Sequence, residues 1–411
     1  MTLYPLYIDP GTGSAIFSIV IGATAAIYFV ARALFLRVKT LVLGGRMVKV
    51  SKNYHPYVVY CEGKQYINVF LPVLEEFERR QIELLYLTSV EEDPVFNAGY
   101  VYIKPEYIGE GNKAFMRLNF LSAGIMLATT PGLDVYQWKK TKDVKHYSHV
   151  LHMIEDATRY EMFGIDYFDS VLLTGEHQVK DIRYLEKIRE LSAKQLLPVG
   201  CSYLDVYADK IKELPLEESH PFTVLVSPTW GPSGLLTLYG EKLLDPLVRT
   251  GWRIIVRPHP QAWKSDSGVI EKLEGRYKGV VNIEWDNNAE NIYTLSKSDV
   301  MISDFSGIMF DYMFLFSRPV FYADEKVDLR KYDAGYIEGE MWQFEIIREI
   351  ATELKEDMFD TIGDLIAKTA NSEDIKQSMQ KVKESAWYYR GEAGKHIVNF
   401  MEQTVNAAIL N

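Results

Sequence analysis

The sequence is short of cysteine and of positive charge, and each shortage argues against a class of protein. Cys61 and Cys201 are the only cysteines among 411 residues, and they lack CxxC or metal-ligand spacing. No disulfide framework is therefore indicated, and a reducing compartment is expected. Lys and Arg total 45 against 56 Asp and Glu, which gives a formal net charge of -11. Sequence-independent binding to nucleic acid needs a basic surface, so we expect no nucleic-acid partner.

Hydrophobic residues are plentiful, at 47% of the chain, and one stretch is too apolar for a soluble domain. Residues 10–31 carry no charged side chain, and apolar residues continue to Leu36. About 20 such residues cross the core of a bilayer as a helix. The positive charges follow at Arg32, Arg37, Lys39, Arg46, Lys49 and Lys52. The positive-inside rule then places the rest of the chain in the cytoplasm.

We therefore predict a single-pass anchor in the cell membrane within residues 1–40, with its span at about residues 11–36. A buried hairpin or core helix is the alternative. The basic residues 37–52 would lie beside anionic lipid headgroups, which attract such segments.

Beyond the anchor, strand and helix patterns alternate in two blocks, which predicts largely parallel α/β sheets. The first block covers residues 50–205, and the second covers residues 218–411 and ends in helices. A charged segment with Pro215 and Pro221 is the expected connection between them. Two doubly wound domains with a cleft between them are the simplest architecture.

Polar clusters follow three predicted strands of the second block, where ligands of open α/β sheets bind. The sequence Ser303-Asp304-Phe305-Ser306-Gly307 comes between an apolar strand and an apolar helix. Ser306 and Gly307 open that helix, so their N–H groups can face an anionic oxygen. Asp311 lies one turn further and could reach a hydroxyl of a ribose or glycol. A simple N-cap is the alternative, because Ser and Asp favour that position.

The other two clusters also offer phosphate ligands at strand ends. In Arg257-Pro258-His259-Pro260 the prolines stiffen the turn, so Arg257 and His259 can point into the cleft. After the strand that comes before this one in the sequence, Thr229 could donate to a phosphate, and Trp230 could form one wall of the site. A loop packed on its own Trp is the alternative there.

Together these blocks resemble the signature blocks of the CDP-glycerol glycerophosphotransferases, the teichoic acid primase and polymerase family. The resemblance covers roughly Tyr147 to Tyr322 and is strongest from Ser303 to Tyr312. It implies a GT-B fold, in which two Rossmann-like domains face each other across the active-site cleft. It also implies that His259, Ser306 and Gly307 hold the donor pyrophosphate, with no catalytic metal and no other cofactor.

The same family usually carries a Trp-His-Gly-Thr-Pro-Leu-Lys stretch, whose His is the expected general base for the acceptor hydroxyl. Here the corresponding stretch places His152 at the His, Met153 at the Gly and Ala157 at the Lys. An imidazole with a pKa near neutrality suits removal of a hydroxyl proton. His152 and His259 are therefore the expected catalytic residues, and Asp156 is expected to orient His152. A buried strand-end histidine is the alternative for His152.

These inferences predict an enzyme of cell-envelope biogenesis on the inner face of the cell membrane. It would transfer glycerol phosphate, or a similar polyol phosphate, from CDP-glycerol or a related donor to a lipid-linked or glycan acceptor. Its donor site would comprise Thr229, Arg257, His259, Ser303, Asp304, Ser306, Gly307 and Asp311. A GT-B glycosyltransferase that uses a nucleotide sugar is one alternative. An inactive GT-B-like binding protein at the membrane is another, favoured by the altered stretch at Met153 and Ala157.

Overall fold

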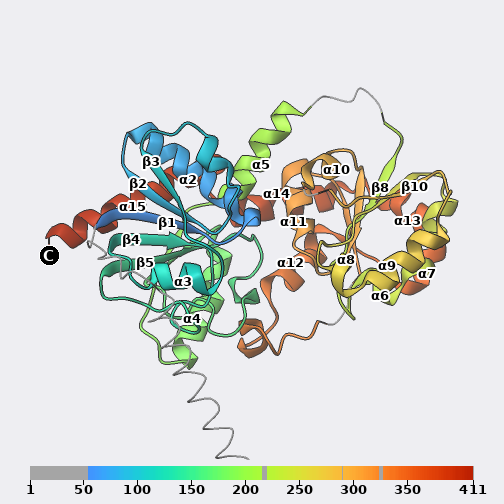
Figure 1. Ribbon diagram of the computed structural model, residues 1–411. Helices are drawn as coiled ribbons and strands as arrows, with labels where there is room; N and C mark the ends of the chain where they lie inside the picture. The colour runs from blue at the N-terminus through green and yellow to red at the C-terminus, as the bar shows by residue number, and fades with distance from the viewer. Residues whose placement is uncertain (1–53, 215–219, 289, 324–326, 411) are drawn as a thin grey trace, which may run out of the picture. The chain divides into compact units, whose positions relative to one another are not determined.

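The computed structural model describes residues 54–214, 220–288, 290–323 and 327–410 (Figure 1). The predicted anchor in residues 1–40 lies outside the described residues. None of the described helices combines the length and the apolar character that a bilayer crossing requires.

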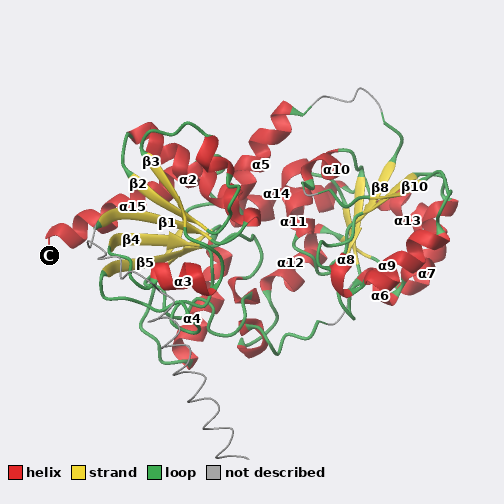
Figure 2. Ribbon diagram, viewed as in Figure 1, coloured by secondary structure: helices red, strands yellow, loops and turns green. Residues whose placement is uncertain are grey.

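The first sheet has seven parallel strands in the order β3-β2-β1-β4-β5-β6-β7 (Figure 2). The strands are β1 (His55–Cys61), β2 (Leu84–Thr88), β3 (Ile103–Tyr107), β4 (Ala123–Ala128), β5 (Val144–Val150), β6 (Ser170–Leu173) and β7 (Gln195–Pro198). The helices within this part of the chain are α2 (Ile67–Arg80), α3 (Asn112–Leu118), α4 (Val179–Ile188) and α5 (Ser202–Glu213). We call the first sheet and these helices the N-terminal lobe.

The second sheet has six parallel strands in the order β10-β9-β8-β11-β12-β13. The strands are β8 (Thr223–Val226), β9 (Arg253–Val256), β10 (Ile283–Trp285), β11 (Val300–Ser303), β12 (Val320–Tyr322) and β13 (Thr352–Glu353). Its helices are α6 (Leu235–Leu238), α7 (Gly240–Arg249), α8 (Ala262–Ser265), α9 (Ser267–Arg276), α10 (Ile292–Ser296), α11 (Ile308–Phe316), α12 (Trp342–Ile350), α13 (Ile362–Thr369) and α14 (Glu373–Ala386). We call this part the C-terminal lobe.

Each sheet is covered on both faces, which explains why its central strands are continuous apolar runs. In β1, Val58 and Tyr60 belong to the core on one face, whereas Val59 and Cys61 belong to the core on the other. Every residue of β4 is buried. The predicted parallel α/β sheets are confirmed.

The last helix, α15 (Ala393–Leu410), packs in the N-terminal lobe. Residues 218–411 were expected to form one domain that included the terminal helices, so this helix is a correction. Its buried residues Ile397 and Met401 share a core with Phe70 of α2, and this apolar stripe determines the packing.

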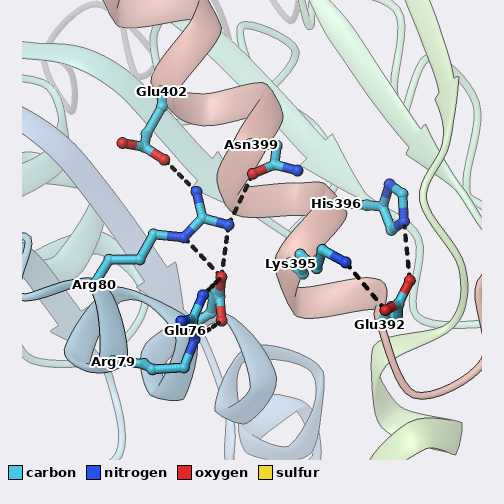
Figure 3. Close-up of polar contacts among 8 residues, drawn as sticks. All are labelled: Glu76, Arg79, Arg80, Glu392, Lys395, His396, Asn399 and Glu402. Atoms are coloured by element: carbon cyan, nitrogen blue, oxygen red, sulfur yellow. Dashed lines mark hydrogen bonds and ion pairs between the residues drawn. The ribbon is translucent and has the colours of Figure 1, made fainter.

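Polar contacts reinforce the pairing of α2 with α15 (Figure 3). The guanidinium of Arg80 donates to Glu76 at 2.7 Å, to Asn399 at 2.8 Å and to Glu402. Arg79, the preceding residue, pairs only with Glu76 among the residues drawn.

Asp205 of α5 fixes the segment through which the chain returns to the N-terminal lobe. Its buried carboxylate accepts hydrogen bonds from Trp387 Nε1 at 3.0 Å, Gly391 N at 2.8 Å and Ala393 N at 3.1 Å. At the start of α15, a Cβ on Gly394 would lie 2.3 Å from the carbonyl oxygen of Pro72. The two helices therefore approach so closely that only glycine fits there.

Replacing Arg80 with Ala should lower the free energy of unfolding by about 1–2 kcal/mol, because Asn399 and Glu402 lose this donor, whereas Glu76 keeps Arg79. Chemical denaturation of the detergent-solubilised chain measures the effect. The control is Arg79→Ala, whose side chain is 68% exposed, and it should be indistinguishable from wild type. Equal effects of the two substitutions would contradict the role given to Arg80.

Candidate active site at the carboxyl ends of the two sheets

Residues that follow strands of both sheets line one cavity of about 580 Å³. We call it the central cavity. The N-terminal lobe contributes His152, which follows β5, together with Tyr66 and Tyr203. Of the predicted donor residues, those that line the cavity are Thr229, Arg257, His259, Ser306, Gly307 and Asp311. The structure thus brings residues far apart in the sequence to one place, because carboxyl ends of parallel strands meet at the same sheet edge.

The loop that carries His152 is held by the side chains of two neighbouring residues. The amide nitrogen of Gln178 lies within hydrogen-bonding distance of the carbonyl oxygens of Met153 (3.1 Å), Ile154 (3.3 Å) and Glu155 (2.7 Å). His177 Nε2 lies 2.7 Å from the carbonyl oxygen of Ile154. These bonds replace the secondary structure that the loop lacks, so His152 has a fixed backbone.

The hydrogen bonds of His152 determine which ring nitrogen carries the proton. Thr129 Oγ1 donates its proton to the carbonyl oxygen of Val150 at 2.8 Å. His152 Nδ1 lies 2.7 Å from the same Oγ1, which can then only accept. His152 Nδ1 must therefore be protonated, and its Nε2 keeps a free lone pair.

The surroundings of His152 favour the neutral, basic form of its ring. Burial lowers the pKa of His152 to about 4. The ring of Tyr66 packs against it, with 4.7 Å between the ring centroids. Tyr160 OH lies 3.2 Å from Nδ1, on the same side as Thr129. Nε2 is thus unprotonated across the neutral pH range, and burial makes it a weaker base than a free imidazole, whose pKa near neutrality was the expectation.

His259, on the opposite lobe, has the other tautomer. The backbone N–H of Gln261 donates to His259 Nδ1 at 3.1 Å, so this nitrogen is unprotonated. Burial lowers the pKa of His259, which favours the neutral ring. Its Nε2 must then carry the proton and act as a donor. One histidine of the cavity thus has an unprotonated Nε2 and the other a protonated Nε2.

Ser303 and Asp304, two of the predicted donor ligands, do not line the central cavity. Both are buried, and Ser303 Oγ donates to the carbonyl oxygen of Ser227 at 2.6 Å. The Asp304 carboxylate accepts from Thr229 N at 2.9 Å and from Leu235 N at 3.0 Å. Their hydrogen-bonding capacity is used by the loop 227–235, so they position Thr229.

Arg257 lines the cavity but already has partners. Its guanidinium pairs with Asp286 at 2.5 Å and donates to the carbonyl oxygen of Asn288 at 2.8 Å. These contacts hold the loop after β10. A ligand phosphate would therefore meet a cation that is partly neutralised.

At the start of α11, Gly307 faces a carboxylate from the other lobe. A Cβ on Gly307 would lie 1.8 Å from Oε1 of Glu155. Glu155 is buried, and its carboxylate lies 3.6 Å from the guanidinium of Arg159. The positive end of a helix attracts such an anion, so Glu155 lies where an anionic ligand would be favoured.

Asp311 lies one turn into α11, where both its protonated and its ionised form are accessible near neutral pH. Burial raises the pKa of Asp311 to about 7. Tyr203 OH donates to its Oδ1 at 2.6 Å. The carboxyl group can thus exchange hydrogen bonds with a ligand hydroxyl in either role.

Asp156 does not orient His152, contrary to the expectation from sequence. Its carboxylate accepts from Trp342 N at 2.8 Å and from Gln343 N at 2.9 Å, and so caps α12. Burial raises the pKa of Asp156 to about 6. The residue that fixes the tautomer of His152 is Thr129, which sequence reasoning missed. The available signal was a threonine pair directly after the apolar strand β4.

The described residues contain no group of three or more His, Cys, Asp or Glu side chains placed to bind a metal ion.

Gly307→Ala should lower the free energy of unfolding by about 1 kcal/mol, because the new methyl group collides with Glu155. In a Glu155→Ala background the cost should disappear, and a double-mutant cycle from denaturation curves measures this coupling. The control is Gly268→Ala in α9, where a Cβ would meet nothing within 4 Å. A cost that persists without the Glu155 side chain would contradict the predicted collision.

Solved structures with the same fold include the wall teichoic acid polymerase TagF. It has a TM-score of 0.54 and 16% identity, over 86% of this chain and 90% of that chain. A TagF variant with CDPG has a TM-score of 0.53 and 16% identity, over 92% and 98% of the two chains. The UDP-GlcNAc 2-epimerase of Methanocaldococcus jannaschii, in complex with UDP-GlcNAc and UDP, has a TM-score of 0.56 and 13% identity, over 85% and 99%.

These likenesses establish the fold alone and confirm the expected GT-B-like α/β architecture of parallel sheets. No curated protein sequence matches the chain. The family model of CDP-Glycerol:Poly(glycerophosphate) glycerophosphotransferase matches residues 168–403, which is more than half of the chain. The expectation drawn from the strand-end blocks is confirmed, and the chain belongs to the CDP-glycerol:poly(glycerophosphate) glycerophosphotransferase family.

Proposed function

We propose that the protein transfers glycerol phosphate, or a similar polyol phosphate, from a CDP-linked donor to a hydroxyl of a lipid-linked or cell-envelope glycan acceptor. The observation that carries this proposal is the pair of opposite tautomers on the central cavity. His152 presents a lone pair from one lobe, and His259 presents an N–H from the other. A group transfer needs both a base for the incoming hydroxyl and a donor for the charge that develops on phosphate.

The donor pyrophosphate would bind the C-terminal lobe. The amino terminus of α11, preceded by Ser306 and Gly307, supplies the positive end of a helix. His259 Nε2 and the Thr229 hydroxyl add side-chain donors. The carboxylate of Glu155 would have to yield this position to the phosphate, since both favour the same helix end.

The reaction itself would be a displacement at phosphorus. His152 Nε2 takes the proton of the acceptor hydroxyl, and the oxygen forms a bond to the β-phosphorus of the donor. The bond from that phosphorus to the bridging oxygen breaks, and CMP leaves with the electron pair. Donors from α11 and His259 would stabilise the negative charge on the phosphate oxygens.

Family membership and the TagF variant with CDPG support CDP-glycerol as the donor. The UDP-GlcNAc 2-epimerases have the same fold, so a nucleotide sugar is the alternative donor to compare with CDP-glycerol.

The protein would act at the inner face of the cell membrane, held by a span at about residues 11–36. The apolar stretch and the basic residues after it support this location. Tethering the site near a lipid-linked acceptor would raise the effective concentration of that acceptor.

Thr129→Val should lower kcat/KM on the order of 100-fold, because His152 loses the acceptor that keeps Nδ1 protonated. Release of CMP from CDP-glycerol measures the rate. Thr129→Ser retains the hydroxyl and should stay near wild type. Wild-type kcat/KM should fall only as the pH drops toward the His152 pKa of about 4, since the base must be neutral.

The role of Thr129 is separated from a structural one by two readouts. Stabilisation by CDP-glycerol should be unchanged in Thr129→Val, because donor binding does not involve His152. In a His152→Gln background, the Val substitution should cost nothing further. A further loss of rate there would show that Thr129 acts through something other than His152.

The donor is tested by thermal stabilisation of the solubilised chain with CDP-glycerol, CDP-ribitol, UDP-sugars and CMP-linked sugars. A donor at 100 times its Kd adds about 2.7 kcal/mol to the native state. The gain with CDP-glycerol should vanish in His259→Ala and persist in His396→Ala, whose histidine lies on α15 and pairs with Glu392. A gain with nucleotide sugars alone would favour a glycosyltransferase. No gain with any donor would contradict the transferase proposal and favour an inactive binding protein.

A further inference from the structure

Four large apolar side chains remain exposed at one edge of the first sheet. They lie one to three residues before strands: Tyr54 before β1, Val101 before β3, Phe120 before β4 and Tyr167 before β6. Because all strands of this sheet are parallel, residues that precede them lie at its amino end. We call these four residues the amino edge. It is opposite to the edge from which His152 extends.

Hydrogen bonds show that the segments of Tyr54, Phe120 and Tyr167 adjoin each other. His55 N donates to the carbonyl oxygen of Ser122 at 3.0 Å, which joins the segment of Tyr54 to that of Phe120. Lys140 Nζ donates to the carbonyl oxygen of Tyr167 at 3.1 Å. The segment 119–122 and the segment 137–143 are also bonded, through Asn119 Nδ2 and Gln137 O at 3.0 Å. The edge from β1 to β6 is thus one surface.

The described residues expose large apolar side chains at several places, and two of those at the amino edge are among the most exposed. Phe120 is 71% exposed and Val101 is 64% exposed. Single exposed apolar residues are common on protein surfaces, but a row of them on one edge marks a contact with another apolar phase or a partner.

Lysines surround the middle of the amino edge. Lys139, Lys142 and Lys145 are exposed, and Lys140 pairs with Asp169 at 2.5 Å. Glu83 and Asp143 lie at the same edge, so the local charge is mixed. Aromatic residues interleaved with lysines are typical of surfaces that lie at the headgroup level of a bilayer.

The chain reaches the N-terminal lobe at this same edge. Tyr54 is the first described residue, and it follows the basic residues 37–52 and the predicted span at about residues 11–36. A basic stretch between a span and a folded lobe is attracted to anionic headgroups. The exposed apolar side chains, the lysines around them and the entry of the chain at this edge all fit contact with a lipid bilayer.

We propose that the amino edge of the first sheet lies against the anionic lipid headgroups of the membrane. The inference rests on the proposed anchor, and it adds which face of the enzyme the membrane contacts. Phe120 and Tyr167 would enter the headgroup layer, and the lysines would meet lipid phosphates. The central cavity, at the opposite edge of the sheet, would then face away from the bilayer.

The test places a fluorescent label on Phe120→Cys in the full chain, reconstituted into vesicles of phosphatidylglycerol and phosphatidylcholine. Both native cysteines are buried, so labelling can be directed to the new thiol. The control is Val281→Cys, which is 100% exposed and lies two residues before β10, at the amino end of the second sheet. Quenching by lipids that carry a quencher at the headgroup reports proximity, and flotation of the vesicles reports anchoring.

Several-fold stronger quenching at position 120 than at position 281, in protein that floats with the vesicles, is the expected result. Equal quenching at the two positions in floating protein would overturn the inference and leave the anchor intact. Protein that does not float would overturn both, and the flotation readout distinguishes this failure from the first. Label at position 120 that is shielded from water but not quenched by lipid would indicate a protein partner, and would also overturn the inference.

Discussion

The carboxylate of Asp205 determines how the chain returns from the second sheet to the first, and the central cavity depends on that return. Three donors from residues 387–393 converge on it, so the segment between α14 and α15 cannot shift without leaving a buried anion unpaired. Burial raises the pKa of Asp205, which shows how costly the uncompensated charge would be. With this segment fixed, α15 packs on α2 and the C-terminal lobe is joined to the N-terminal lobe at both ends of its sequence.

The two lobes meet through complementary helix ends and carboxylates. Asp156 of the N-terminal lobe caps α12 of the C-terminal lobe. Glu155, the residue before it, lies at the amino terminus of α11. Adjacent residues of one loop thus satisfy the positive ends of two helices of the other lobe. The contact of Asp156 with α12 is made by hydrogen bonds within the protein. The position of Glu155 at α11 is the one that an anionic donor would occupy.

Sequence patterns located the cavity because its chemistry follows strand ends. His259 comes after β9, Ser306 comes after β11, and parallel strands end at the same edge. The patterns failed where a side chain acts across strands. Thr129 lies beside Val150 only because Ala128 is paired with His149 in the register of β4 and β5. Asp304 looked like a ligand, since its role in holding Thr229 depends on the path of a loop. The packing of α15 on the N-terminal lobe was not predicted either, because an apolar stripe does not indicate which surface it will cover.

The length of β5 has a consequence for the acceptor. The strand runs from the lysine-rich amino edge to the loop of His152, and its seven residues span about 20 Å. With the amino edge on the bilayer, a hydroxyl on a lipid headgroup would fall short of the base by roughly that distance. A growing chain would have to extend beyond it before its terminal hydroxyl could be deprotonated. The length of the strand would therefore favour acceptors that are already several units long over a lipid that carries no chain.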